Sequence, residues 1–197
     1  MVKTVAIYVF DEIEVLDLGG PFEVFSVANR LAGKEGREQP FQVVTVSRAA
    51  DRIEARGGYR FCTTHRFADA PSVDVLVVPG GVVDHECDRP DVIAWLRQAH
   101  EGAELTASVC TGAFLLAQAG LLSGLSVTTH WEDIDELERR YPDLTVVRDR
   151  LWVDQGRIVT SGGISAGIDM SLHLVRRPDR KSTRLKSSHL GISCAGF

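Results

Sequence analysis

A predicted strand runs directly into a predicted helix at Cys110, with no connecting loop between them. Leu105–Val109 (LTASV) is typical of a short buried strand, and residues 111–117 (TGAFLLA) open an apolar helix. Small residues flank the cysteine on both sides, as a tight turn requires. A side chain at such a junction is lifted above the sheet, in the arrangement called a nucleophile elbow. The junction therefore favours a fold in which strands and helices alternate.

The rest of the chain repeats this alternation. Apolar β-branched runs predict strands, longer apolar patterns predict helices, and paired short runs predict a connecting arm at 51–63 and a hairpin at 151–160. Such an order predicts an α/β fold with a doubly wound, mostly parallel sheet and helices on both faces. The expected strands are Thr4–Phe10, Phe41–Ser47, Val73–Val78, Leu105–Val109, Ser126–Thr129 and Leu144–Val147; the expected helices are Pro21–Ala32, Pro90–Glu101, 112–120, Glu132–Tyr141 and Ser165–Arg176.

Composition excludes several classes of protein. A chain of 197 residues with 44% hydrophobic content makes one globular domain, and its net charge of −5 gives no case for nucleic-acid binding. Neither a signal peptide nor a membrane span is evident. The cysteines at 62, 87, 110 and 194 lack metal-ligand spacing. We therefore expect free thiols in a reducing cytoplasm, no metal, no cofactor and no membrane partner, with Cys62 and Cys87 acting simply as small hydrophobes.

The segment Asp179–Phe197 (DRKSTRLKSSHLGISCAGF) looks like translated sequencing adapter. In that frame the adapter gives Asn, Tyr and Val where this chain has Lys186, Cys194 and Gly196. The alternatives are a basic flexible tail or a nucleic-acid-binding patch. We expect a domain over residues 1–178, cut short at its C-terminus, followed by an adapter-derived tail at 179–197 without functional residues.

Cys110 is the candidate nucleophile, and Asp17 is its candidate acid/base partner. The N-terminus of the following helix is expected to lower the pKa of the cysteine and yield a thiolate at neutral pH. Asp17 lies in an otherwise apolar segment after the first strand, so partial burial would suit its carboxyl to proton transfer. The alternatives are an inert buried cysteine and an aspartate that merely caps a helix. Glu12, Glu14 and Glu23 are weaker candidates.

Further candidates surround the elbow. Gly80 and Gly81 follow a buried strand, and with the N–H groups of Thr111 and Gly112 they could form an oxyanion-type hole; an ordinary turn is the alternative. Thr111 could bind substrate or water, or only fill the elbow. His130 follows its own short strand, where Glu132 could orient it, although a lone histidine is more often structural.

The segment Gly163–Gly167 matches the G-x-S-x-G pattern of serine hydrolases. The match is weak, because the later histidine, His173, lies on the same predicted helix. A glycine-rich helix entry that lines the pocket of Cys110 is the favoured interpretation.

Together, AIYVFDEIEVLDLGGPFEVF, VDVLVVPGG, ASVCTGAFLLAQAGLL, TTHW and GGISAGIDMSLHLVRR resemble the DJ-1/PfpI superfamily over residues 3–177. The pattern is most similar to isonitrile hydratases and to the amidase-like domains of AraC-type regulators. The resemblance implies a flavodoxin-like sandwich that usually dimerises. It also implies Cys110 as nucleophile, Asp17 as acid/base, Thr111 as assisting residue, and Gly80 and Gly81 as an oxyanion-type turn.

Two departures narrow the function. Proteases of this superfamily place histidine after the cysteine, where this chain has Thr111, and glyoxalase-like members use glutamate where it has Asp17. The first hypothesis is a cysteine-dependent hydro-lyase that hydrates an isonitrile, its small-molecule substrate, to an N-substituted formamide, acting as a homodimer. The second is a ligand-sensing domain of an AraC-type regulator whose DNA-binding part is missing. A third is redox sensing through oxidation of Cys110.

Overall fold

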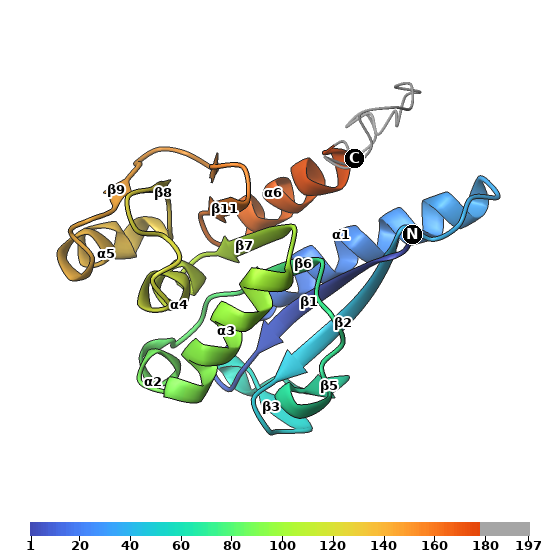
Figure 1. The fold of residues 1–197 in the computed structure, drawn as a ribbon, viewed down its shortest axis with the longest axis horizontal. Coiled ribbons are helices and arrows are strands. Elements are labelled where there is room, and N and C mark those ends of the chain that lie inside the picture. The colour runs from blue at the N-terminus through green and yellow to red at the C-terminus, as the bar shows by residue number, and fades with distance from the viewer. Residues whose placement is uncertain (178–197) are drawn as a thin grey trace.

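The sheet is the framework that positions every candidate residue. The structure is a computed structural model that describes residues 1–177, so the segment Asp179–Phe197, interpreted above as adapter-derived, lies outside the described residues. Seven strands form the main sheet in the order β10-β11-β7-β6-β1-β2-β5 (Figure 1). All neighbours are parallel except β10 and β11. The strands are β1 Lys3–Val9, β2 Phe41–Ser47, β5 His65–Arg66, β6 Val75–Val78, β7 Leu105–Val109, β10 Trp152–Asp154 and β11 Ile158–Ser161.

Two small β-structures flank this sheet. Strands β3 (Arg52–Glu54) and β4 (Arg60–Cys62) form the expected arm as an antiparallel hairpin. Strands β8 (Ser126–Val127) and β9 (Thr145–Val146) form a separate parallel pair rather than joining the main sheet. The hairpin contacts the loop after β1, because the Glu12 N–H donates to the Glu54 carbonyl.

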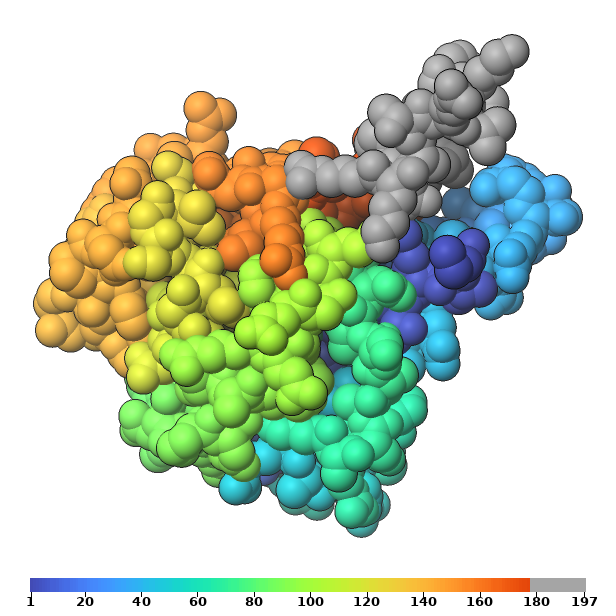
Figure 2. Space-filling view, viewed as in Figure 1, coloured from blue at the N-terminus to red at the C-terminus, as the bar shows by residue number. Residues whose placement is uncertain are grey.

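Helices cover both faces of the sheet, which confirms the predicted doubly wound α/β class. Helices α1 and α6 pack together on one face, and α2, α3 and α4 pack together on the other (Figure 1). In the space-filling view, the α2–α3 segment covers much of the near side (Figure 2). The helices are α1 Val15–Lys34, α2 Asp84–Cys87, α3 Pro90–Gly102, α4 Gly112–Gln118, α5 Ile134–Arg140 and α6 Ser165–Arg176.

The core is centred on β1, where every side chain from Val5 to Val9 is buried. A strand buried on both faces reads as a continuous apolar run, which is why the sequence pattern located it correctly. Tyr8 is part of this run, and its hydroxyl donates to the buried carboxylate of Glu86. Glu86 also pairs with Arg89, so the charge of this buried carboxylate is balanced.

Helix α1 begins earlier than the sequence pattern predicted. Pro21 was expected at its first turn, but the helix starts at Val15 and Pro21 lies inside it. The proline ring removes only one backbone bond, the bond to the carbonyl of Asp17 four residues earlier. Asp17 is therefore in the first turn of α1 and is not its N-cap, a position that Glu14 occupies. Helix α2 and strand β5 were not predicted.

Candidate active site

Cys110 occupies a strained turn between β7 and α4. Its φ is +57°, in the left-handed region that residues with a side chain seldom adopt. Two neighbouring strand ends hold the turn: the Cys110 N–H donates to the Ser161 carbonyl at 3.1 Å, and the Cys110 carbonyl accepts from Thr129 Oγ1 at 2.8 Å. The side chain is 9% exposed. The expected elbow is therefore present, and its cysteine is buried.

Glycines at two positions allow the elbow to pack this tightly. A Cβ on Gly80 would lie 2.7 Å from Cys110 Cβ and 2.7 Å from the Thr111 backbone nitrogen. A Cβ on Gly112 would lie 2.1 Å from the Val78 carbonyl oxygen. Both contacts are far too short for a side chain, so the end of β6 and the start of α4 approach each other because no Cβ intervenes.

Thr111 and Gly81 bond to each other in both directions. The Gly81 N–H donates to Thr111 Oγ1 at 2.9 Å, and the Thr111 hydroxyl donates to the Gly81 carbonyl at 2.9 Å. The Gly81 N–H is thus already used, which does not fit its expected place in an oxyanion hole. The Thr111 hydroxyl has no further proton to donate. This pair clamps the Gly80–Gly81 turn to the elbow.

Asp17 is fully buried beside Cys110, as expected for its partner. Its Oδ1 accepts a hydrogen bond of 2.9 Å from the Ile164 N–H, which is 147 residues away in the chain. Its Oδ2 is also buried and has no hydrogen-bond partner among the described residues. The Cys110 thiol and the Gly80 N–H both lower the pKa of this carboxyl group, although burial has the larger, opposite effect. An unsatisfied buried carboxylate oxygen is costly, which points to a functional role.

The electrostatics correct the expectation of a resting thiolate. Burial, and then the Asp17 charge, raise the pKa of Cys110; the Thr111 N–H opposes this shift and is outweighed. Burial also raises the pKa of Asp17. Each anion disfavours the other, so the two groups lose their protons in separate steps and hold one proton between them in the intervening pH range.

The loop from Ser161 to Ile164 completes the site. A Cβ on Gly163 would lie 3.1 Å from Cys110 Sγ and 2.9 Å from His130 Cδ2, so the sulfur and the imidazole both lie next to this glycine. Ile164 has a φ of +57° and a ψ of −107°, a rare conformation for a β-branched residue. This strained backbone aims the Ile164 N–H at Asp17.

His130 lies next to the sulfur, but its partner differs from the expected one. Its Nδ1 is 3.3 Å from Asp133 Oδ2 and 3.8 Å from Glu132 Oε2. Asp133, at the end of the short turn that follows His130, is therefore better placed than Glu132 to orient the ring. The Asp133 charge also acts on the Cys110 thiol.

Sequence reasoning missed two contributors to the site, Ile164 and Asp133. Ile164 acts through its backbone N–H, which carries no residue-type signal, whereas the G-x-S-x-G match drew attention to Ser165. The strained position is Ile164, and Ser165 begins α6 with an exposed side chain. This geometry agrees with the favoured interpretation of a glycine-rich helix entry beside Cys110.

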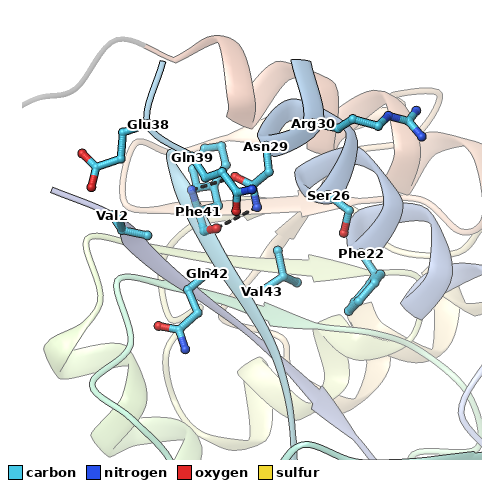
Figure 3. Close-up of a pocket in the computed structure, with 10 residues that line it drawn as sticks. All are labelled: Val2, Phe22, Ser26, Asn29, Arg30, Glu38, Gln39, Phe41, Gln42 and Val43. Atoms are coloured by element: carbon cyan, nitrogen blue, oxygen red, sulfur yellow. Dashed lines mark hydrogen bonds between the residues drawn. The ribbon is translucent and has the colours of Figure 1, made fainter. Parts of the chain in front are cut away.

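A separate groove of about 900 Å³ lies between α1 and the edge of β2. Figure 3 shows Asn29 bonded to both backbone groups of Phe41 there, which blocks part of the open strand edge. The groove contains none of the candidate catalytic residues; its lining is Val2, Phe22, Ser26, Asn29, Arg30, Glu38, Gln39, Phe41, Gln42 and Val43.

The part of the chain that the structure describes has neither a metal-binding cluster nor a membrane-spanning helix. No group of three or more histidine, cysteine, aspartate or glutamate side chains there is arranged to hold a metal ion. Within the same range, no helix has the length and apolar character needed to cross a membrane.

The fold and the elbow define a class: doubly wound α/β proteins that carry a cysteine at a strand-to-helix turn with a buried acid beside it. The chain belongs to the DJ-1/PfpI family, whose model matches residues 3–177.

Two kinds of curated relative are about equally similar to the chain. It is 31% identical over 176 residues to the HTH-type transcriptional regulator GbdR of Pseudomonas aeruginosa, covering 89% of this chain and 46% of the regulator. It is 33% identical over 179 residues to an isonitrile hydratase of Pseudomonas putida, covering 89% of this chain and 72% of the hydratase. The chain thus spans about half the length of the regulator it matches.

Solved structures support the same fold. A ThiJ/PfpI family protein from Pseudomonas syringae superposes with a TM-score of 0.77 at 25% identity, covering 89% of this chain and 68% of that one. Drosophila melanogaster DJ-1beta superposes with a TM-score of 0.72 at 21% identity, covering 89% of each chain. The flavodoxin-like arrangement implied by the sequence resemblance is confirmed.

Proposed function

We propose that this protein is a cysteine-dependent hydro-lyase that hydrates an isonitrile to an N-substituted formamide. The observation that carries the proposal is the buried pair of Cys110 and Asp17, in which one carboxylate oxygen has no hydrogen-bond partner among the described residues. Such an oxygen is free to accept the thiol proton during nucleophilic attack. The similarity to an isonitrile hydratase supports the choice of substrate.

The first half of the reaction forms a covalent adduct. Cys110 Sγ attacks the terminal carbon of the isonitrile and forms an S–C bond, while Asp17 takes the thiol proton. Asp17 then delivers this proton to the same carbon, which yields a thioimidate, R–N=CH–S–Cys. The raised pKa of Asp17 suits both transfers, because a weaker acid is a better base and can still return the proton.

The second half releases the product. Asp17 takes one proton from water as the water oxygen adds to the thioimidate carbon, and it passes this proton to the nitrogen. The tetrahedral adduct then collapses: its hydroxyl proton moves to Asp17, the C=O bond forms, the C–S bond breaks, and Asp17 returns the proton to Sγ. The product is R–NH–CHO. We propose that the N–H groups of Thr111 and Gly112 stabilise charge at this stage, and that His130 borders the substrate. The Thr111 hydroxyl stays in its clamp with Gly81.

The test is formamide production from benzyl isonitrile. We expect turnover in the unsubstituted chain and its loss, by a factor of about 10³ or more, in Cys110→Ala. The matched control is Cys62→Ala, which removes an exposed cysteine on β4 and should keep full activity. Substantial turnover by Cys110→Ala would disprove the scheme.

A second candidate function is ligand sensing. The chain matches less than half of a transcriptional regulator at an identity close to that of the hydratase match. A sensor needs a ligand site but not the nucleophile, so ligand binding without turnover, retained in Cys110→Ala, would favour this candidate. For either function we propose a homodimer in the cytoplasm that acts on a small molecule without a cofactor.

A further inference from the structure

Several residues that are next in sequence to residues of the site have exposed apolar side chains. Large exposed apolar residues are costly and, when clustered, mark binding surfaces. Four large exposed apolar residues are next in sequence to residues of the site, and we call these four the apolar collar: Leu16, Val82, Trp131 and Ile164. Trp131 is the largest and the most open of the four, with 74% of its surface exposed.

Contacts of the backbone tie the collar to the reacting groups. Leu16 precedes Asp17 on α1, and Ile164 donates its N–H to the same aspartate. Val82 follows Gly81, which is clamped to Thr111 next to the sulfur. Trp131 follows His130, and the two ring centroids are 5.7 Å apart. The collar residues therefore belong to four different chain segments whose backbones meet at one site.

Charge at the site is negative. The Asp133 carboxylate lies 3.3 Å from Nδ1 of His130, the imidazole beside the Cys110 thiol, and Glu14 is the N-cap of the helix whose first turn holds Asp17. No cationic side chain is among the main influences on the pKa of Cys110 or of Asp17. Arg56 approaches Glu14 at 3.6 Å, but both side chains are partly exposed, so solvent weakens this ion pair. An anionic substrate would meet these carboxylates, and the His130 imidazole beside the sulfur already faces Asp133.

We infer that the apolar collar selects uncharged molecules that carry a bulky apolar group next to the reacting carbon, and that the site rejects carboxylates. This inference deepens the proposed function by naming the class of isonitrile. It applies to any electrophile that reaches Cys110, so it can be tested without turnover.

The experiment compares three alkylating agents at Cys110: iodoacetamide, N-benzyl iodoacetamide and iodoacetate. Mass spectrometry of the Cys110 peptide gives each rate, and each is divided by the rate of the same agent with glutathione. We expect the benzyl reagent to exceed iodoacetamide by about tenfold, because its ring is buried against the collar. We expect the normalised rate of iodoacetate to be about tenfold below that of iodoacetamide, because the carboxylates of Asp133 and Glu14 repel its negative charge.

Variants assign these effects to residues. Trp131→Ala should remove most of the benzyl preference. The matched control is Phe22→Ala. Phe22 is also an exposed aromatic residue, but it lies on α1 and lines the separate groove of Figure 3, so its removal should leave the preference unchanged. Asp133→Asn should bring iodoacetate closer to iodoacetamide. Thermal unfolding checks that each variant is folded.

Two results would overturn the inference: iodoacetate as fast as iodoacetamide after normalisation, or equal benzyl preferences in Trp131→Ala and Phe22→Ala. Turnover of benzyl isonitrile is measured on the same samples. A retained benzyl preference without turnover would refute the hydratase function and support selection by the collar. Turnover without any benzyl preference would support the hydratase function and refute selection by the collar.

Discussion

At the scale of single residues, the site depends on glycine, because a residue without a Cβ leaves room for its neighbours. Gly163 has Cys110 Sγ and His130 within 3.1 Å of the point where a side chain would begin, whereas Gly162 has nothing closer than 3.5 Å. Adjacent glycines therefore have different reasons to be glycine. Gly163 keeps the sulfur and the imidazole together, and Gly162 could accept a methyl group at ordinary contact distance.

This contrast yields a prediction. Gly163→Ala should displace Cys110 or His130 and lower Cys110-dependent activity at least tenfold, with a stability loss of about 1–3 kcal/mol from overpacking. Gly162→Ala should keep activity within about twofold and stability within about 0.5 kcal/mol. Steady-state kinetics and urea unfolding measure both. Equal activities in the two variants would show that the space at Gly163 is unimportant.

At the scale of elements, the packing of α1 against α6 sets the position of Asp17. The helices approach closely at Gly20, where a Cβ would lie 2.7 Å from Ile168 Cγ1. Asp17 is one helical turn earlier on α1, and its partner Ile164 immediately precedes α6. The bond between Asp17 and Ile164 therefore depends on how closely these two helices pack.

Two neighbouring glycines in α1 test this dependence. Gly19 has nothing within 4 Å of its Cβ position. Gly19→Ala should stabilise the protein by about 0.5–1 kcal/mol, because alanine loses less conformational entropy in a helix. Gly20→Ala should instead destabilise it by about 1–3 kcal/mol and reduce activity, since α6 must shift. Thermal unfolding distinguishes them, and equal shifts in Tm would contradict the proposed close packing.

At the scale of the whole molecule, local patterns predicted the fold well and the site in part. Continuous apolar runs located β1, β2, β6 and β7, and small residues around Cys110 located the elbow. Pro21 obscured the true start of α1. The bond from Ile164 to Asp17 joins residues 147 positions apart, and no local pattern encodes such a contact. The raised pKa of Cys110 depends on burial, which the sequence does not reveal.

The oligomeric state stays a prediction at this scale. We expect sedimentation equilibrium to give about twice the chain mass of 21.6 kDa at micromolar concentration. The same measurement on a chain that ends at Pro178 tests the tail: if Asp179–Phe197 is adapter-derived, its removal should leave mass per assembly and Tm essentially unchanged. A monomer at all concentrations would refute the dimer, and a large loss of Tm would refute the interpretation of the tail.

The central claim is that Cys110 and Asp17 behave as one coupled pair, and thiolate absorbance near 240 nm tests it most directly. A pH titration of the unsubstituted chain minus that of Cys110→Ser isolates the Cys110 thiolate. Because burial and the Asp17 charge raise the pKa of Cys110, thiolate should appear above the ordinary cysteine range of about 8.5. Asp17→Asn removes the charge, so its thiolate should appear at lower pH. A thiolate already complete at pH 6, or a titration that Asp17→Asn leaves in place, would contradict the coupled pair.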